Sequence, residues 1–220
     1  MKHFGTTLKI LLATPFALSM MMGTASAASI TPVSASSPFA HFTFSLSDDR
    51  SPTRTIDSSG LNGLGQHTNV LGNPQAWLAD AAQYGSAVGP TITWDLGGLY
   101  DLSSMHIWNY NENQRTQEGI KDVNVFVSTD GSSFSLAGLY SLTSAPGVTT
   151  YLGDSYSLAA TARYVKFDVL SVQNPTPFGA HAGLSEIRFE GTATPEPSTF
   201  VLLGVSAAVL GIARRKRMTR

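Results

Sequence analysis

Three segments of the chain combine aromatic side chains with amide, guanidinium and imidazole groups: 75–77, 111–115 and 173–181. An aromatic ring can stack on the apolar face of a sugar, while amide, Arg and His groups hydrogen-bond its hydroxyls. This chemistry requires the three segments to lie together on the surface. The ligand-binding candidates are Trp77, Asn111, Arg115, Asn174, Phe178 and His181.

Each of these candidates also has a purely structural alternative. Trp77 can plug the core instead of presenting a stacking face, and Asn111 can satisfy backbone groups of its own loop. Trp94 and Trp108 lie inside predicted strands, which favours a place in the core or on a sheet face. His181 follows a Pro- and Gly-containing segment and is typical of a loop.

Catalytic signatures are weak in this sequence. The chain has no Cys and contains neither H-E-x-x-H nor G-x-S-x-G. Asp48 and Asp49 are adjacent and would face opposite sides of a strand. Glu112 and Glu118 could form the carboxylate pair of a glycoside hydrolase, but the sequence places both in a loop with no evident burial to raise either pKa. The sequence therefore favours binding over catalysis.

Short strands should position these loops. Alternating apolar and polar residues predict strands over 41–46, 91–96, 105–110, 123–127, 134–140, 164–170 and 184–189. Gly97-Gly98 predicts a turn and Asp130-Gly131 a hairpin, whereas 75–84 has the only helix-like pattern. Seven short strands separated by turn signals predict an all-β, antiparallel sandwich.

The order of five segments resembles the discoidin domains, also called coagulation-factor type C domains, of the galactose-binding-like jelly rolls. The segments are 56–61, Trp77, 92–97, 121–131 and 184–189. The likeness spans residues 40–191 and implies a jelly-roll β-sandwich whose loops at one end bind ligands. Residues 28–39, rich in Ser, Ala and Pro, would then be a loose lead-in. Ser58 departs from the pattern, since Gly often follows the preceding Asp in related domains.

The same resemblance implies a structural Ca²⁺ ion. Such an ion would be held by an early carboxylate, several backbone carbonyls and a Glu on the last strand. Asp57 and Glu186 occupy the matching positions, and the glycines of 58–65 let carbonyl oxygens turn inward at little steric cost. The alternative is that Asp57 caps a turn and Glu186 is a solvated strand residue.

The N-terminus has the pattern of a secretory signal peptide over residues 1–27. Lys2 and Lys9 precede an apolar stretch that ends in the small residues Ala25-Ser26-Ala27. This pattern predicts export through the Sec machinery and cleavage after Ala27.

The C-terminus carries Pro195, Glu196 and Pro197, then an apolar run over 200–213 and a basic tail. As a helix the run would be about 21 Å long, short for a bilayer core of about 30 Å, and the cations would stay cytoplasmic. The arrangement resembles the PEP-CTERM sorting signal of Gram-negative bacteria, which an exosortase is thought to cut near the Pro-Glu-Pro motif. The resemblance implies a linker over 192–198, a sorting helix with its basic tail over 199–220, and transient inner-membrane insertion.

Removing the two ends leaves residues 28–194, with seven Lys and Arg against 14 Asp and Glu, a net charge near −7. An acidic domain lacks the basic surface that nucleic-acid binding requires. Without Cys, its stability must come from core burial and any bound ion. The sequence predicts a non-enzymatic surface protein that binds carbohydrate such as extracellular polysaccharide. The alternatives are a matrix or adhesive protein without a glycan pocket and, less favoured, a glycan hydrolase.

Overall fold

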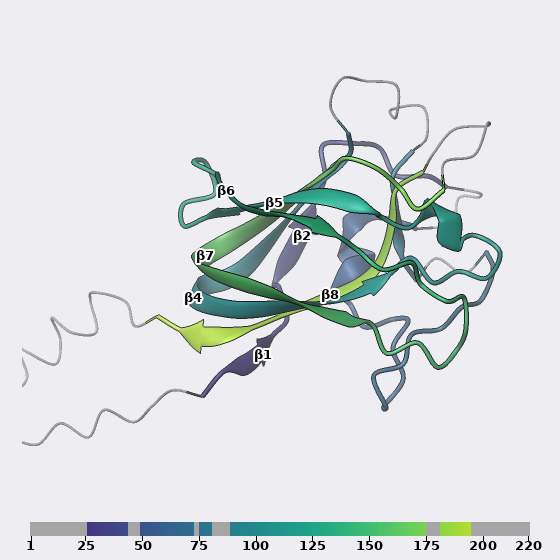
Figure 1. The fold of residues 1–220 in the computed structure, drawn as a ribbon, viewed down its shortest axis with the longest axis horizontal. Helices are drawn as coiled ribbons and strands as arrows, with labels where there is room; N and C mark the ends of the chain where they lie inside the picture. Colours follow the sequence, from purple (N-terminus) through teal and green to yellow (C-terminus); the bar gives the residue numbers. More distant parts are fainter. Residues whose placement is uncertain (1–25, 44–48, 73–74, 81–88, 175–180, 195–220) are drawn as a thin grey trace, which may run out of the picture.

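The computed structural model describes residues 26–43, 49–72, 75–80, 89–174 and 181–194 (Figure 1). Its strands are β1 (Ala28–Ile30), β2 (Ser34–Ser36), β3 (Trp77–Leu78), β4 (Thr91–Asn109), β5 (Asp122–Ser128), β6 (Ser135–Ser141), β7 (Asp154–Val169) and β8 (Gly183–Ala193). Two 3-10 helices are η1 (Pro52–Thr55) and η3 (Thr116–Glu118). These elements confirm the predicted all-β class.

The strands pair in the order β1-β8-β4-β7-β5-β6, while β2 pairs with β4 and β3 pairs with β8. All of these strand pairs are antiparallel. The long strands β4 and β7 bend, so that the sheet wraps around the core as the two layers of a jelly-roll sandwich (Figure 1). The predicted architecture is therefore confirmed.

The expected turn at Gly97-Gly98 is wrong, because β4 continues through it from Thr91 to Asn109. The register of β4 against β7 shifts between Asp95 and Tyr100, and Gly97 has a φ of 79° there. A glycine with positive φ suits either a turn or a β-bulge. Here it is a bulge that bends the strand from one layer toward the other.

Buried and more exposed residues alternate along the strands, and the buried ones form the core between the layers. In β5, for example, Val123, Val125 and Val127 are buried while the residues between them are half-buried. The ring of Trp94 lies edge-on to Phe167, with centroids 4.8 Å apart, and its indole N–H donates to Thr55 Oγ1 at 2.8 Å. Trp94 is thus the core residue that its strand position predicted.

Residues 28–39 are not a loose lead-in, because they contribute two strands to the sandwich. β1 pairs with the last strand, Ala28 opposite Gly191, and β2 pairs with β4, Ser34 opposite Asp95. Ladder hydrogen bonds use backbone groups and need no apolar alternation. A Ser- and Ala-rich segment can therefore form strands that the hydrophobic pattern does not reveal.

Two further sequence expectations change around residue 77. The helix expected over 75–84 is wrong for its described part, since β3 pairs with β8 there and Trp77 faces Leu184. The strand expected over 41–46 is reduced to an isolated bridge between His41 and Ala79, and residues 44–46 lie outside the described part. Long-range pairing overrides the local pattern at both places.

The predicted hairpin at Asp130-Gly131 is confirmed between β5 and β6. Gly131 has a φ of 75°, and Asp130 Oδ1 accepts hydrogen bonds from the backbone N–H groups of Ser132 and Ser133, both at 2.8 Å. These bonds stabilise the ionised carboxylate and lower the pKa of Asp130 to about 2.

The described chain enters and leaves at one end of the sandwich, on the adjacent strands β1 and β8 (Figure 1). The signal peptide and the C-terminal sorting helix, with Pro195, Glu196 and Pro197, lie outside the described residues. Within the residues that are described, no helix has the length and apolar character to cross a membrane.

Candidate functional site

The loops gather at the end of the sandwich opposite to the chain ends, on the right in Figure 1. We call this region the loop end; it comprises 58–72, 110–121, 142–153, 170–174 and 181–182. Hydrogen bonds between side chains and backbone tie the loops together. Asn69 Nδ2 donates to Gly147 O at 2.6 Å, and Gln173 Nε2 donates to the carbonyls of Ile120 and Leu142 at 2.9 and 2.8 Å. A rigid scaffold thus presents linked loops, the usual location of function.

Asn111 organises these loops and is not available to a ligand. It is fully buried, and its amide nitrogen donates to the carbonyls of His67, Thr68 and Val148 at 3.2, 3.1 and 2.8 Å. Its Oδ1 accepts from the Gly147 N–H at 2.9 Å. The ligand role predicted for Asn111 is therefore wrong, and the structural alternative holds.

Trp77 is likewise excluded from stacking on a sugar. Its exposed fraction is 0%, because β3 inserts the indole into the core beside the last strand. Trp108, 7% exposed, packs with Ala145 and Tyr151 in a smaller cluster, and its indole N–H donates to Gly65 O at 3.0 Å. Both rings support the loop end from within.

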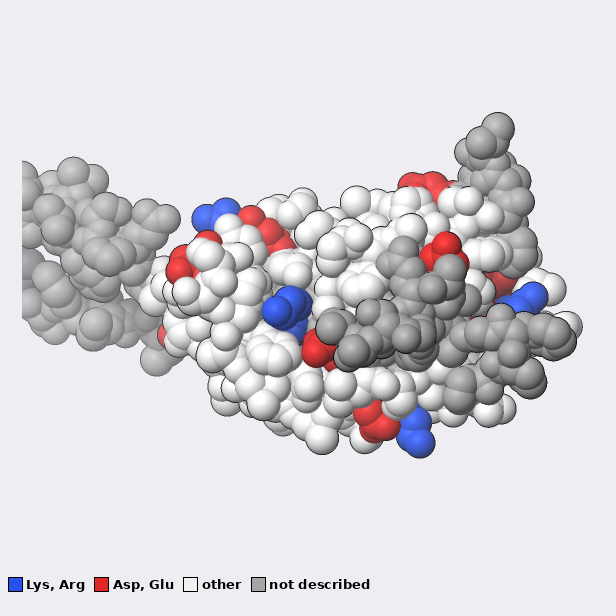
Figure 2. Space-filling model, turned by 90° about the horizontal axis from the view of Figure 1, so that it is seen from above, with Lys and Arg blue, Asp and Glu red and all other residues white. Residues whose placement is uncertain are grey.

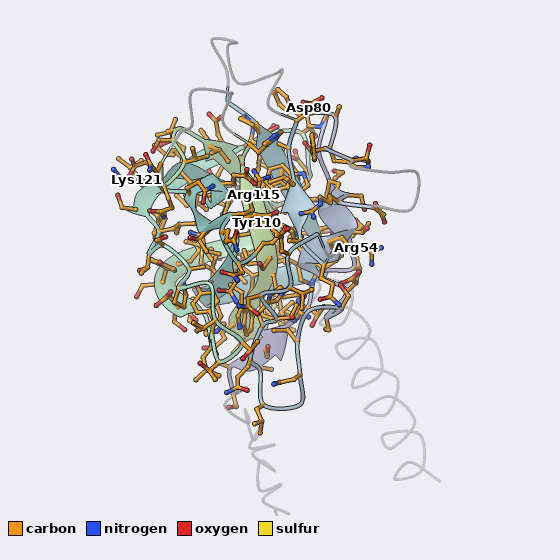
Figure 3. All side chains as sticks on the ribbon, turned by 90° about the vertical axis from the view of Figure 1, so that its right-hand side faces the viewer. Arg54, Asp80, Tyr110, Arg115 and Lys121 are labelled. Carbon is orange, nitrogen blue, oxygen red and sulfur yellow. The ribbon has the colours of Figure 1, made fainter. Side chains whose placement is uncertain are left out.

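Three of the predicted ligand residues do meet, around η3. Arg115 precedes this helix and forms an ion pair with Glu118 at 3.2 Å. The backbone N–H of Asn174 donates to Gln117 O at 3.0 Å. Burial raises the pKa of Glu118, while the nearby His181 and Arg115 act to lower it. Figure 3 looks onto this end, with Arg115 near the centre of the view.

Phe42 is an aromatic residue beside His181 that the sequence pattern does not identify as part of a site. Its ring lies against the His181 imidazole, with centroids 4.6 Å apart and planes tilted by 59°, and both residues are half-buried. His181 Nδ1 also contacts Ala79 O at 2.9 Å. The sequence pattern assigned Phe42 to a strand and contained no signal of this pairing. Phe178, the other aromatic candidate, lies outside the described residues.

A buried polar network underlies these groups. Arg50 is fully buried, and its guanidinium donates to Tyr110 Oη at 2.5 Å and to Glu112 Oε2 at 2.7 Å. Tyr110 also donates to Glu112, while the Gly72 N–H donates to the other carboxylate oxygen. Burial, together with the Glu112 charge, raises the pKa of Tyr110.

This network corrects the expectation that Glu112 and Glu118 lack burial. They are 7% and 6% exposed, respectively. Each carboxylate is nevertheless engaged by an arginine, Glu112 by Arg50 and Glu118 by Arg115. Their burial thus accompanies structural contacts that anchor the loop between β4 and β5.

Asp57 and Glu186, the residues expected to hold Ca²⁺, lie close together but are each paired with an arginine. Asp57 pairs with Arg54 at 3.1 Å. The Arg188 guanidinium contacts Glu186 Oε1 and donates to Ser58 Oγ at 2.6 Å. No group of three or more His, Asp or Glu side chains suited to a metal occurs within the described ranges. With guanidinium groups on both carboxylates, the arrangement does not fit a Ca²⁺ ion.

The alternative assigned to Glu186 is also wrong, since this residue is fully buried and not solvated. Burial raises its pKa to about 7, although Arg188 beside it favours the ionised form. Glu186 Oε1 accepts the backbone N–H of Ser58 at 3.3 Å, and Ser58 adopts a φ of 61°. The cluster therefore ties the 57–59 loop to β8.

The face of the sandwich seen in Figure 2 carries few charges. On the face shown in Figure 2, Lys and Arg alternate with Asp and Glu among uncharged residues, without a continuous basic area.

Residues 193–217 match the family model described as the PEP-CTERM protein-sorting motif. This match confirms the sorting signal expected around Pro195, Glu196 and Pro197. It indicates an exported bacterial protein that reaches the cell surface or the outside of the cell. No curated protein matches the chain in sequence.

Solved structures share the sandwich. CBM32-3 of a family 31 glycoside hydrolase from Clostridium perfringens aligns at 14% identity with a TM-score of 0.51, covering 74% of this chain and 95% of that chain. The C-terminal domain of a chitobiase from Bacteroides fragilis aligns at 16% identity with a TM-score of 0.51, covering 76% and 100%. These likenesses show a fold in common with a CBM32 domain.

A family 89 glycoside hydrolase from Clostridium perfringens, solved with 2-acetamido-1,2-dideoxynojirmycin, aligns at 17% identity with a TM-score of 0.48. The alignment covers 73% of this chain but only 14% of the hydrolase. This chain therefore corresponds in length to a small part of that enzyme.

Proposed function

We propose that this chain is an exported, non-enzymatic protein that binds carbohydrate, such as extracellular polysaccharide, at the surface of a Gram-negative bacterium. The binding surface is the part of the loop end around η3. The observation that carries the proposal is that Arg115 and His181 both lie near Glu118 of η3, that Asn174 is bonded to Gln117 of η3, and that Phe42 packs against His181. We call the group of four residues Arg115, Asn174, His181 and Phe42 the η3 surface.

The η3 surface combines the groups that sugar recognition needs. The side chain of Arg115 is 44% exposed, so donors remain beyond those that face Glu118. Asn174 is exposed in the connection between β7 and β8 and contributes an amide. The half-buried ring of Phe42 takes the stacking role that was first assigned to Trp77.

Two further findings support the proposal. The domains that share the sandwich are parts of a glycoside hydrolase and a chitobiase, enzymes that act on glycans. The sorting motif is consistent with Sec-dependent export, transient insertion in the inner membrane and processing by an exosortase. A glycan-binding domain released by this route would meet the polysaccharide that surrounds the cell.

The proposal assigns no catalysis to the chain. Glu112 and Glu118 are the carboxylates that could serve a hydrolase, and both are held by arginines in the structure. The alternative function is a structural protein of the extracellular matrix with no defined glycan pocket. Trp77 and Trp108 are buried and cannot stack on a sugar, which favours the matrix protein. The η3 surface favours glycan binding.

A glycan array with the full-length protein tests the proposal. We expect retention on at least one polysaccharide, and Arg115→Ala to weaken it about tenfold, which corresponds to about 1.4 kcal/mol. Lys121→Ala is the matched control, because it removes another exposed cation of the loop end without touching η3. The absence of retention on every glycan would favour the matrix protein, and release of shortened glycans would show a hydrolase.

A further inference from the structure

A cleft with a volume of about 300 Å³ opens at the loop end, apart from the η3 surface. Its wall is formed by the 59–68 loop, and Gln75 and Thr149 complete its lining. None of the residues that line it belongs to the η3 surface. The volume lies at the lower end of the range of roughly 300–1,000 Å³ that small-molecule sites occupy.

Several polar groups that line this cleft are not used in hydrogen bonds within the described residues. The hydroxyls of Ser59, Thr68 and Thr149 and the Gln66 amide nitrogen form no hydrogen bond within the described part of the chain. Gln75 Oε1 is buried there and also lacks a hydrogen-bond partner. A buried polar atom in a folded protein nearly always has a partner, so Gln75 Oε1 favours occupation of the cleft by a polar ligand or by water. The Ser59 and Thr149 hydroxyls are exposed and can donate to a ligand or to solvent.

The walls of the cleft are fixed before any ligand arrives. Asn62 Oδ1 accepts the backbone N–H groups of Leu64 and Gln66 at 2.9 and 3.0 Å, and Asn62 Nδ2 donates to Gln66 Oε1 at 2.9 Å. The His67 N–H donates to Tyr151 O at 2.8 Å, which joins this loop to the one that carries Thr149. A site arranged in advance spends less conformational entropy on binding.

The chemistry of the lining selects the class of ligand. Six lining residues have hydroxyl or amide side chains: Ser59, Asn62, Gln66, Thr68, Gln75 and Thr149. Leu61 adds a half-buried apolar surface, and no lining residue is charged. Hydroxyls and amides both donate and accept, as sugar hydroxyls do. An anionic sugar would find no cation among the residues that line the cleft.

We propose that this cleft is a second glycan site, which binds one uncharged sugar residue through its hydroxyl groups. It is independent of the η3 surface, so that a chain with both sites could hold a polysaccharide at two points. Engagement of two linked sites raises the overall affinity without any new contact. The inference rests on the cleft alone and stands whether or not the η3 surface binds.

Amide chemical shifts of the full-length protein test the proposal during titration with single sugars. The probes are the methyl glycosides of glucose, galactose, mannose and N-acetylglucosamine, at up to about 50 mM because one-residue sites bind in the millimolar range. We expect at least one of these to shift the amides of 59–68 and Thr149. Galacturonic and glucuronic acid should shift the same amides less.

Thr149→Val removes one exposed hydroxyl and keeps the shape of the side chain. We expect it to weaken the binding seen at the cleft by about 3–10-fold. Thr150→Val is the matched control, since Thr150 is the exposed neighbour that does not line the cleft, and it should bind like the native protein. Arg115→Ala should also leave the cleft shifts unchanged, which separates this site from the η3 surface. The proposal fails if no uncharged sugar shifts these amides, if uronic acids shift them as strongly, or if Thr149→Val binds normally.

Discussion

At the scale of single residues, Glu186 and Arg188 connect a loop to the last strand. Its carboxylate is fully buried beside Arg188, whose guanidinium also reaches Ser58 Oγ at 2.6 Å. A bound cation at this place would join the 57–59 loop to the last strand, and the arginine makes the same connection from within the chain. The ionised form of Glu186 is thereby paired with a guanidinium group.

The titration of Glu186 predicts a specific pH dependence. Its pKa is about 7 in the folded protein against 4.5 for an unperturbed glutamate, so the folded state binds the proton more tightly. The resulting stabilisation is present below about pH 4.5 and is lost as the pH rises through about 7. We expect the free energy of unfolding of the native protein to fall over this range relative to Glu186→Gln, by on the order of 2–3 kcal/mol. Urea denaturation of both proteins between pH 4.5 and 8 measures it, and parallel curves would contradict it.

Removal of calcium is expected to have no effect on stability. Arg54 and Arg188 already neutralise Asp57 and Glu186, so a divalent cation would have to displace a guanidinium from either carboxylate. The melting temperature should be the same in EDTA and in excess CaCl₂. A melting temperature that falls in EDTA and recovers on addition of Ca²⁺ would show that the ion implied by the discoidin resemblance is present.

At the scale of elements, the bend in β4 determines how the layers meet. The strand runs from Thr91 to Asn109, with register shifts against β7 after Asp95 and after Leu102. Gly97 at a φ of 79° forms the first of these irregularities and lies against Val33, the residue before β2. One glycine therefore both bends the longest strand and lets the N-terminal strands approach it.

Alanine substitution of Gly97 and of its neighbour Gly98 tests whether the bulge specifically requires Gly97. In Gly97→Ala a Cβ would lie 2.8 Å from Val33 Cγ1 on a backbone with positive φ, so we expect a loss of about 1–3 kcal/mol in the free energy of unfolding. In Gly98→Ala the nearest heavy atom, on the Tyr100 ring, is 3.5 Å away, an ordinary contact. Chemical denaturation should show Gly98→Ala close to the native protein, and equal losses in both variants would argue against the bulge.

At the scale of the whole molecule, the ends of the described chain and the loops with the proposed glycan sites lie at opposite ends of the sandwich. β1 and β8 are neighbours, Ala28 opposite Gly191, and the described chain enters and leaves beside them (Figure 1). The loops that carry both proposed glycan sites lie at the opposite end. A sorting motif that begins at residue 193 is thus attached to the end remote from the loops. This arrangement leaves the loop end free to contact polysaccharide.

Truncation of the chain tests how much the N-terminal strands β1 and β2 stabilise the sandwich. A chain that starts at residue 38 lacks β1 and β2, whereas one that starts at residue 28 retains both. Ile30 is 6% exposed in the core, and loss of its burial alone costs about 2–3 kcal/mol. Thermal unfolding should therefore show a lower midpoint for the shorter chain. Equal midpoints would mean that residues 28–36 are the loose lead-in that their composition suggested.

Local pattern was sufficient for much of the fold and for part of the candidate site. The alternation around Val125, the turn residues at Asp130-Gly131 and the core position of Trp94 all follow from neighbours in sequence. The prediction of Arg115 and His181 as ligand-binding residues also follows from local sequence. Cationic and imidazole side chains in long connections between strands are typical of loops that bind ligands.

The sequence by itself determined the all-β class, the sorting signal at the C-terminus and the polar character of the loops, since each depends on residues close together in the chain. Only the tertiary structure decided which aromatic ring reaches the surface. Trp77 is buried because β3 pairs with β8, more than 100 residues away, and Phe42 lies beside His181 for the same reason. Burial depends on what packs across the sandwich, and no local pattern contains that information.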